Sequence, residues 1–260
     1  MKKTKVALLF GGRSGEHEVS RNSAYSVAKA LSDKYDVFAI GISKEGEWYG
    51  PVLLEEIKQF VPEKYSDKKI TILPNPASGG TIYQLPGLKP LYQAEVFFPV
   101  LHGTFGEDGT IQGLLDLAQV PYIGAGVLSS SAGMDKIFMK KIFAEAGLPQ
   151  VPYLYFLRTL IDNNLLQVIT EIEEKLGYPC FVKPANLGSS VGISKAVNRG
   201  QLEEALKKAA RYDRKVIVEK GLYVRELEVS VLGNDQPRAS LPGEIVPCNE
   251  FYDYKAKYSD

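Results

Sequence analysis

The first two predicted strands and the loop between them constrain the fold more than any other part of the sequence. Residues 5–10 are an apolar run that predicts a buried strand, residues 11–20 form a glycine-rich loop, and residues 37–42 predict a second strand. Between loop and second strand, apolar residues recur at helical spacing, namely Ala24, Val27, Ala28 and Leu31. In such a strand-helix-strand unit the strands are parallel and ligands gather at the loops that follow them. The loop 11–20 is therefore a candidate site.

The same pattern returns further along the first half of the chain. Residues 94–101 predict a buried strand that ends at His102, a helix follows, and residues 121–123 predict a short strand. A doubly wound α/β domain is expected to close near Gly124. Residues 129–147 then predict one amphipathic helix that ends at a glycine.

The second half of the chain has a different pattern. Strands are predicted over residues 181–184, 192–197 and 215–219, with a helix before the last of them, which indicates a small α+β domain. A third segment starts near residue 220 and includes a predicted strand over residues 226–232. Between residues 48 and 91 the pattern is weaker, and only short strands such as 69–73 are expected.

Composition excludes several classes of protein. The 31 basic and 31 acidic residues cancel, which removes the positive field that non-specific binding to nucleic acid or to a membrane surface requires. The two cysteines, Cys180 and Cys248, lack metal-ligand spacing and argue against a disulfide scaffold or a zinc site. The apolar run near the start is too short for a signal peptide, and no run reaches membrane-spanning length. We expect small-molecule ligands and a cytoplasmic location.

The segment 183–192, KPANLGSSVG, carries the strongest single chemical signal. A lysine closes a predicted strand, and the loop after it offers backbone N–H groups and two hydroxyls that could cradle a polyphosphate. It is not a P-loop, because the lysine precedes the glycines. The alternative is a flexible hairpin loop beside an exposed lysine.

Two neighbouring segments favour the phosphate interpretation. Met134-Asp135-Lys136 opens a helix upstream, and residues 218–222 (VEKGL) end a strand downstream. Together with 183–192 they resemble the ATP-grasp enzymes. That resemblance implies that two lysines neutralise the phosphates and that a strand end reads the adenine through one donor and one acceptor. The implied ATP-binding residues are Lys136, Lys183, Ser189, Ser190, Glu219, Lys220, Leu222 and Glu226 (the last for the ribose).

Two further segments narrow the resemblance to the D-alanine:D-alanine ligase family. They are residues 11–20 (GGRSGEHEVS) and 102–110 (HGTFGEDGT). Glu16 would place a carboxylate at the ammonium group of a small zwitterion, and His102 would act on the substrate side beside the D-alanine carboxylates. The alternatives are that Glu16 and Glu18 complement a helix N-terminus, which we adopt for Glu18 only, and that His102 is hydrogen-bonded locally.

Residues 251–258 (FYDYKAKY) look like the mobile omega loop of these ligases. The resemblance implies a catalytic triad of Glu16, Ser189 and Tyr258, with Lys257 on the substrate side. The loop would act as a lid that excludes water from an acyl phosphate. The alternative is a surface loop with buried aromatic rings. Lys255 stands where the commonest form of the loop has an acidic residue, which leaves its contacts open.

The resemblance implies the whole reaction. ATP phosphorylates one D-alanine, and the amine of a second attacks the acyl phosphate to give D-alanyl-D-alanine for peptidoglycan, with Mg²⁺ screening the phosphates. We expect an α/β fold, with an N-terminal doubly wound parallel sheet (1–124) followed by ATP-grasp α+β domains (125–218 and 219–260, the last incomplete). The magnesium ligands are expected beyond this sequence, so that no metal ligand is named and the chain alone is expected to be inactive. Family members usually form homodimers.

Three other functions stay open from the sequence. A D-alanine:D-lactate ligase is the nearest, and Lys257 and Tyr258 argue against it. A non-catalytic nucleotide-binding module is the second. The third is another carboxylate-amine ligase, since Lys136, Lys183 and Glu219 are generic to ATP-grasp chemistry.

Overall fold

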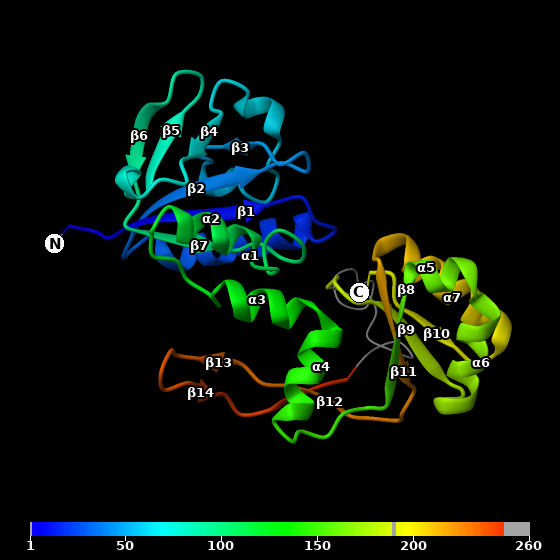
Figure 1. Cartoon of the computed structure of the whole chain (residues 1–260). Helices are drawn as coiled ribbons and strands as arrows, with labels where there is room; N and C mark the ends of the chain where they lie inside the picture. Colours follow the sequence, from blue (N-terminus) through cyan, green and yellow to red (C-terminus); the bar gives the residue numbers. More distant parts are fainter. Residues whose placement is uncertain (1, 189–190, 247–260) are drawn as a thin grey trace. The chain divides into compact units, whose positions relative to one another are not determined.

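The computed structural model describes residues 2–188 and 191–246. The chain divides into two compact units, one comprising Met1–Leu148 with Asn186–Gly188 and the other Pro149–Ala185 with the chain from Ser189 onward. Each unit has its own core, and each is described separately below (Figure 1). None of the described helices combines the length and apolar composition that crossing a membrane requires.

The first unit is built on a four-stranded sheet. Strand β1 (Lys5–Gly11) pairs in parallel with β2 (Asp36–Ile42) and β7 (Val96–Pro99), and β3 (Trp48–Tyr49) adds an antiparallel edge, giving the order β3-β2-β1-β7. The predicted strand 121–123 contributes a single parallel bridge between Phe97 and Tyr122. The expected parallel sheet is confirmed.

Helices cover both faces of this sheet (Figure 1). Successive residues of β1 point to opposite faces, so that Leu8 and Phe10 pack with helix α1 (His17–Leu31), while Ala7 and Leu9 pack on the side of helix α2 (Thr110–Leu117). Full burial of a leucine or phenylalanine side chain is worth about 1.5–3 kcal/mol. The apolar run that predicted β1 is thus explained by burial on both faces.

Residues between β3 and β7 form short elements that the sequence indicated only weakly. They include the one-turn helices Leu54–Glu56, Pro62–Tyr65 and Pro76–Ser78 and an antiparallel sheet of β4 (Ile70–Ile72), β5 (Thr81–Gln84) and β6 (Lys89–Gln93). Ile70, Ile72 and Ile82 join the core on the α2 side.

The single helix expected over residues 129–147 is wrong, because the structure has two helices. Helix α3 (Val127–Met134) ends at Asp135, whose backbone is extended, and α4 (Lys136–Glu145) follows. The Asp135 carboxylate accepts hydrogen bonds from the N–H groups of Ile137 (3.0 Å) and Phe138 (3.1 Å), and so caps α4. A capping aspartate inside an apolar periodicity therefore marks a break between helices.

The second unit contains an antiparallel sheet in the order β10-β9-β11-β8. Its strands are β8 (Tyr153–Leu157), β9 (Cys180–Pro184), β10 (Ser194–Ala196) and β11 (Lys215–Lys220). Helices α5 (Arg158–Asn163), α6 (Leu165–Lys175) and α7 (Arg199–Tyr212) lie on one face (Figure 1). This is the expected α+β arrangement.

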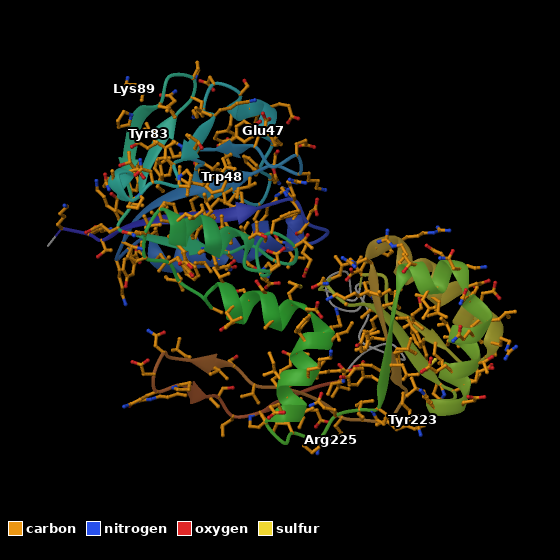
Figure 2. All side chains as sticks on the ribbon, viewed as in Figure 1. Glu47, Trp48, Tyr83, Lys89, Tyr223 and Arg225 are labelled. Carbon is orange, nitrogen blue, oxygen red and sulfur yellow. The ribbon has the colours of Figure 1, made fainter. Side chains whose placement is uncertain are left out.

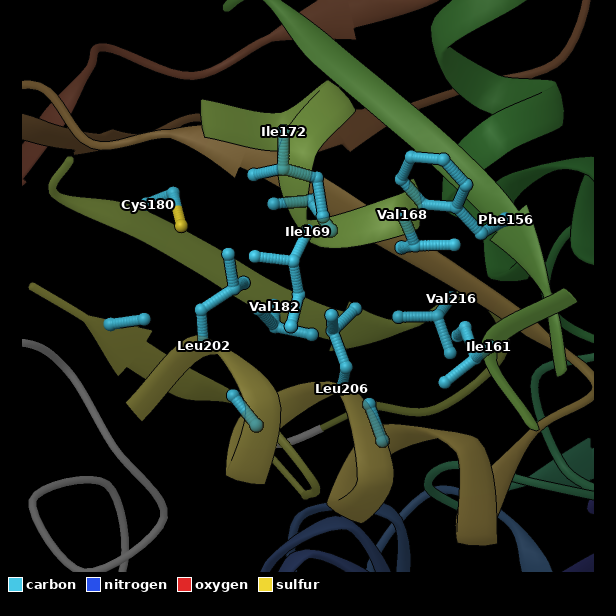
Figure 3. Close-up of a cluster of buried hydrophobic side chains, with 14 of the residues drawn as sticks. Phe156, Ile161, Val168, Ile169, Ile172, Cys180, Val182, Leu202, Leu206 and Val216 are labelled. Carbon is cyan, nitrogen blue, oxygen red and sulfur yellow. The ribbon is translucent and has the colours of Figure 1, made fainter. Parts of the chain in front are cut away.

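The core of the second unit lies between that face and the helices. Figure 3 shows Val182 and Val216 of the sheet beside Ile169 of α6 and Leu202 and Leu206 of α7, all of them at most 1% exposed. Cys180 belongs to the same core as a free thiol, and burial raises its pKa to about 11.

The described chain ends in two short antiparallel pairs. Strand β12 (Glu226–Glu228) pairs with β15 (Gly243–Ile245), and β13 (Val231–Leu232) pairs with β14 (Arg238–Ala239). The single strand predicted over residues 226–232 is therefore wrong. The break follows from pairing, since each half has a different partner strand.

Candidate active site

In the first unit the loop after β1 places Glu16 in a buried position. Glu16 is only 6% exposed and occupies the N-cap position of α1, yet its side chain makes no capping hydrogen bond. An ideal Cβ built on Gly103 would lie 2.6 Å from the Glu16 Oε2 atom, and one built on Gly188 would lie 2.9 Å from it. The carboxylate therefore lies against two glycines that have no side chain to displace it.

The neighbouring Glu18 behaves differently. It is exposed in the first turn of α1 and forms an ion pair of 2.6 Å with Lys44, which lowers the pKa of the Glu18 carboxyl although partial burial opposes the shift. This contact supports the assignment of Glu18 to surface and helix-terminus electrostatics.

His102 follows β7 and lies in the same loop cluster as Glu16. The Ser14 hydroxyl donates to the His102 carbonyl (2.7 Å) and accepts from the Glu16 N–H (3.1 Å), so that one side chain bridges the two loops. The His102 Nε2 atom lies 3.0 Å from Ser23 Oγ, and Nδ1 lies 3.5 Å from Glu107 Oε1. The sequence motifs thus bring residues 16 and 102 together.

Two carboxylates act on the charge of His102. The hydrogen bond to Glu107 raises the pKa of His102 above its ordinary value, burial opposes the shift, and the Glu16 charge adds to it. Glu107 is held in turn by the Gly103 N–H at 2.8 Å. Burial acts against ionisation of Glu107, but these hydrogen bonds lower its pKa. A cationic imidazole is favoured here, which suits binding of a carboxylate ligand.

A cavity of about 670 Å³ opens beside His102 in the first unit. We call it the α3 cavity, because α3 forms one wall. Its lining includes Leu101, His102, Gly106, Glu107, Gln112, Ser129, Ser130, Met134, Lys136, Leu187 and Gly188. The volume falls in the range of small-molecule sites. Its lining includes the cation Lys136 and the imidazole of His102.

Lys136 is the first residue of α4. Its ammonium group donates to the Leu187 carbonyl at 2.6 Å, and an antiparallel bridge joins Asp135 to Asn186. The loop segment 186–188 thus packs on the start of α4, and Lys136 shares a cavity with His102.

In the second unit a cation and a carboxylate meet on the sheet. Lys183 on β9 and Glu219 on β11 form an ion pair, and both side chains are mostly buried, at 24% and 15% exposed. The Lys183 ammonium also lies 5.9 Å from the centroid of the Phe181 ring. Because Cys180, Val182, Val216 and Val218 belong to the core, alternation puts Phe181, Lys183 and Glu219 on the face away from the helices. This mixed aromatic and charged surface fits a nucleotide.

At the strand end after Glu219, two of the next three backbone N–H groups already donate hydrogen bonds within the protein. The N–H groups of Lys220 and Gly221 donate to the carbonyls of Pro152 (2.9 Å) and Pro179 (2.8 Å). In the described part of the chain, no hydrogen bond uses the Leu222 N–H, and its side chain is 49% exposed. Glu226 lies half-buried at the start of β12.

Four expected site residues, Ser189, Ser190, Lys257 and Tyr258, lie outside the described residues. Sequence reasoning assigned no role to Ser14, Ser23 or Glu107, although Ser14 and Glu107 are polar residues inside the two quoted motifs. Among the described residues, no group of three or more metal-ligating side chains occurs.

Comparison with known proteins agrees with these motifs. The model of the D-ala D-ala ligase N-terminus matches residues 5–125, and that of the D-ala D-ala ligase C-terminus matches residues 142–260. The D-alanine--D-alanine ligase of Heliobacterium modesticaldum is 53% identical over 261 residues, which cover 100% of this chain and 71% of the relative.

Solved structures give the same result. The chain is similar to the VanG D-Ala:D-Ser ligase from Enterococcus faecalis (TM-score 0.85, 34% identity, 99% of this chain and 74% of that chain). It is also similar to the D-alanine-D-alanine ligase from Coxiella burnetii (TM-score 0.83, 35% identity, 94% and 71%). Because the two family models match residues 5–125 and 142–260 and the relative is 53% identical over the whole chain, this chain belongs to the D-alanine–D-alanine ligase family, ATP-dependent enzymes that join two D-alanine molecules.

Proposed function

We propose that Glu16 and His102 bind the first D-alanine, and that the Lys183–Glu219 face binds ATP, in an enzyme that makes D-alanyl-D-alanine for peptidoglycan. In this reaction ATP phosphorylates the carboxylate of one D-alanine. The amine of a second attacks the acyl phosphate, and ADP and phosphate leave. The observation that carries the proposal is a buried carboxylate, Glu16, that does not cap its own helix and lies beside an imidazole with a raised pKa.

The two charges suit the two ends of a zwitterion. The ammonium group of D-alanine would pair with Glu16, a charge-assisted contact worth about 1.5–3 kcal/mol. His102, whose pKa is raised by Glu107, would attract the carboxylate in its protonated form. Holding both ends orients the substrate for phosphoryl transfer.

The residues proposed to bind ATP fall into two groups, cations for the phosphates and carboxylates for the adenine and ribose. Lys183 and Lys136 would neutralise phosphate oxygens, with Ser189 and Ser190 offering hydroxyls. Glu219 and the Leu222 N–H would read the adenine edge, with Lys220 as part of the same strand end and Glu226 at the ribose. Because Lys183 is already paired with Glu219, bound phosphate would compete for its ammonium group. The described residues offer no group of three or more carboxylate, histidine or cysteine side chains for Mg²⁺, which when bound would supply charge screening at the phosphates.

Several further features are proposed on the family resemblance. They are a Glu16–Ser189–Tyr258 triad with Lys257 on the substrate side, a homodimer, action in the cytoplasm, and domains at 1–124, 125–218 and 219–260.

Calorimetric titration of the chain with D-alanine and with D-lactate tests the assignment of Glu16. D-lactate has a hydroxyl in place of the ammonium group, so Glu16→Gln should weaken D-alanine binding about tenfold or more and leave D-lactate binding unchanged. Glu18→Gln is the matched control and should change neither. Equal loss of both ligands in Glu16→Gln would show that Glu16 does not recognise the amine.

A further inference from the structure

A second, smaller cavity of about 250 Å³ lies in the first unit on the β3 side of the His102 loop. We call it the Trp48 cavity, after the chain's only tryptophan, which Figure 2 labels on β3. Its walls are the loop after β1, the turn between β2 and β3, the loop after His102, and α2. The lining residues include Gly12, Arg13, Ile42, Glu45, Gly46, Trp48, Leu101, His102, Phe105, Ile111 and Leu114.

The floor of the Trp48 cavity is apolar. Ile42, Leu101 and Ile111 are buried, and Trp48 and Leu114 are half-buried against the same core. The volume is below the range of about 300–1,000 Å³ that drug-sized ligands occupy, so it suits a small apolar group.

The rim carries one cation and one anion. Arg13 and Glu45 are both exposed, and within the described residues they form no ion pair with each other or with any other side chain. The surrounding charges are already paired, since Lys44 bonds Glu18 at 2.6 Å and Lys69 pairs with Glu47. Two unpaired opposite charges thus flank an apolar floor.

The position of Arg13 is constrained by its neighbours. Its guanidinium lies 4.6 Å from the centroid of the Phe105 ring, and a Cβ on Gly46, whose φ is +93°, would lie 2.6 Å from the Arg13 Cδ atom. Phe105 itself has a φ of +64°, an unusual value for a bulky residue, and its N–H donates to the Asp108 carboxylate at 2.8 Å. Such backbone strain is typical of ligand clamps.

We propose that the Trp48 cavity binds a free amino acid with an apolar side chain. The carboxylate would pair with Arg13 and the ammonium group with Glu45, while the side chain would lie on the floor beside Trp48. Leu101, His102 and Gly106 line both this cavity and the α3 cavity. An occupant would therefore contact the loop that carries His102. Its binding would change the surroundings of His102 in the proposed D-alanine site.

Because Trp48 is the sole tryptophan, its fluorescence reports directly on this cavity. The probes are D-leucine and L-leucine, with 4-methylpentanoate, which lacks the amine, and isoamylamine, which lacks the carboxylate. One leucine enantiomer or both should change the emission saturably, and each single-charge analogue should bind at least tenfold more weakly.

Charge variants assign each end of the ligand. Glu45→Gln should weaken leucine about tenfold and leave 4-methylpentanoate unchanged, whereas Arg13→Met should weaken leucine and leave isoamylamine unchanged. Arg13→Lys should restore part of the affinity. The exposed neighbours Glu63 and Lys64 line none of the cavities described, so Glu63→Gln and Lys64→Met serve as controls.

Three results would overturn the proposal. The first is no saturable response to either leucine enantiomer at millimolar concentration. The second is a response that Glu45→Gln and Arg13→Met both leave unchanged. The third is a response abolished by Glu16→Gln and kept in Glu45→Gln, which would place leucine in the proposed D-alanine site. Failure of D-alanine to bind would bear on the proposed function alone.

Discussion

Replacing Gly188 by alanine should move the Glu16 carboxylate without straining the backbone. The new Cβ would lie 2.9 Å from the Glu16 Oε2 atom, and Gly188 does not have a left-handed φ. Since carbon and oxygen pack at more than 3 Å, the carboxylate must retreat by roughly 0.5 Å or more. The carboxylate is the far end of a flexible glutamate side chain and can move, so the variant should fold normally.

The expected loss is one of ligand affinity. Under the proposed function, Glu16 supplies a charge-assisted contact worth about 1.5–3 kcal/mol, and such contacts depend on distance and direction. A misplaced carboxylate should therefore weaken D-alanine binding about tenfold, which corresponds to about 1.4 kcal/mol. The melting temperature should change little.

Calorimetric titration with D-alanine measures the affinity, and thermal unfolding measures the stability. Gly113→Ala in α2 is the matched control, because a Cβ there meets nothing within 4 Å. That change should leave the affinity unaltered and raise stability by about 0.5–1 kcal/mol. Gly103→Ala should lower both the D-alanine affinity and the stability. Its Cβ would lie 2.6 Å from Glu16 Oε2, and its φ of +73° adds about 1–2 kcal/mol of strain.

Native affinity for D-alanine in a normally folded Gly188→Ala variant would refute the reasoning. It would mean that the Glu16 carboxylate is not the partner of the substrate amine.

Three more results are expected. Glu219→Gln should leave the fold intact while weakening binding of ATP several-fold in a calorimetric titration, because the charged acceptor for the adenine amino group becomes a neutral amide oxygen, which accepts more weakly; unchanged affinity would contradict the nucleotide assignment. Leu202→Ala removes a fully buried side chain of the α7 core and should cost about 3–5 kcal/mol in urea unfolding, and a loss below 1 kcal/mol would count against the core. Glu107→Gln should lower the pKa of His102, which NMR of the chain's two histidines can follow. Since that pKa is raised in the folded state, the stabilisation from protonated His102 is complete below about pH 6.5 and is lost as pH rises through the raised pKa. The stability difference between wild type and Glu107→Gln should therefore shrink at alkaline pH, and a constant difference would exclude this linkage.

Long apolar runs made the main strands predictable from the sequence. Strands β1, β2, β9 and β11 were expected within one or two residues, because each is buried on at least one face and is bounded by turn residues. The strand β8 and helices α5 and α6 were not expected. The residues of β8 alternate core and exposed positions, Phe156 at 5% against Tyr155 at 47%, yet both are aromatic, so the sequence shows no polar alternation.

The candidate site was predictable where chemistry and local sequence coincide. Glu16 and His102 sit in glycine-rich loops after parallel strands, and such loops meet at one edge of the sheet. Ser14 and Glu107 were missed because their roles depend on contacts across 88 and 4 residues that only the folded loops create. The Trp48 cavity was also invisible in the sequence, since its floor and rim come from four separate segments.

The position of Lys136 separates what folding requires from what function requires. A lysine at the first position of a helix faces the positive end of the macrodipole, which is unfavourable by about 0.3–1 kcal/mol, and Asp135 already caps α4. Its ammonium group donates to the Leu187 carbonyl at 2.6 Å, which offsets part of this cost. Local rules that are broken in this way are typical of functional sites. A bound polyphosphate would make the position of Lys136 favourable, since helix N-termini and lysines both attract it. The position of Lys136 at the start of α4 therefore supports its proposed nucleotide role more directly than the motif does.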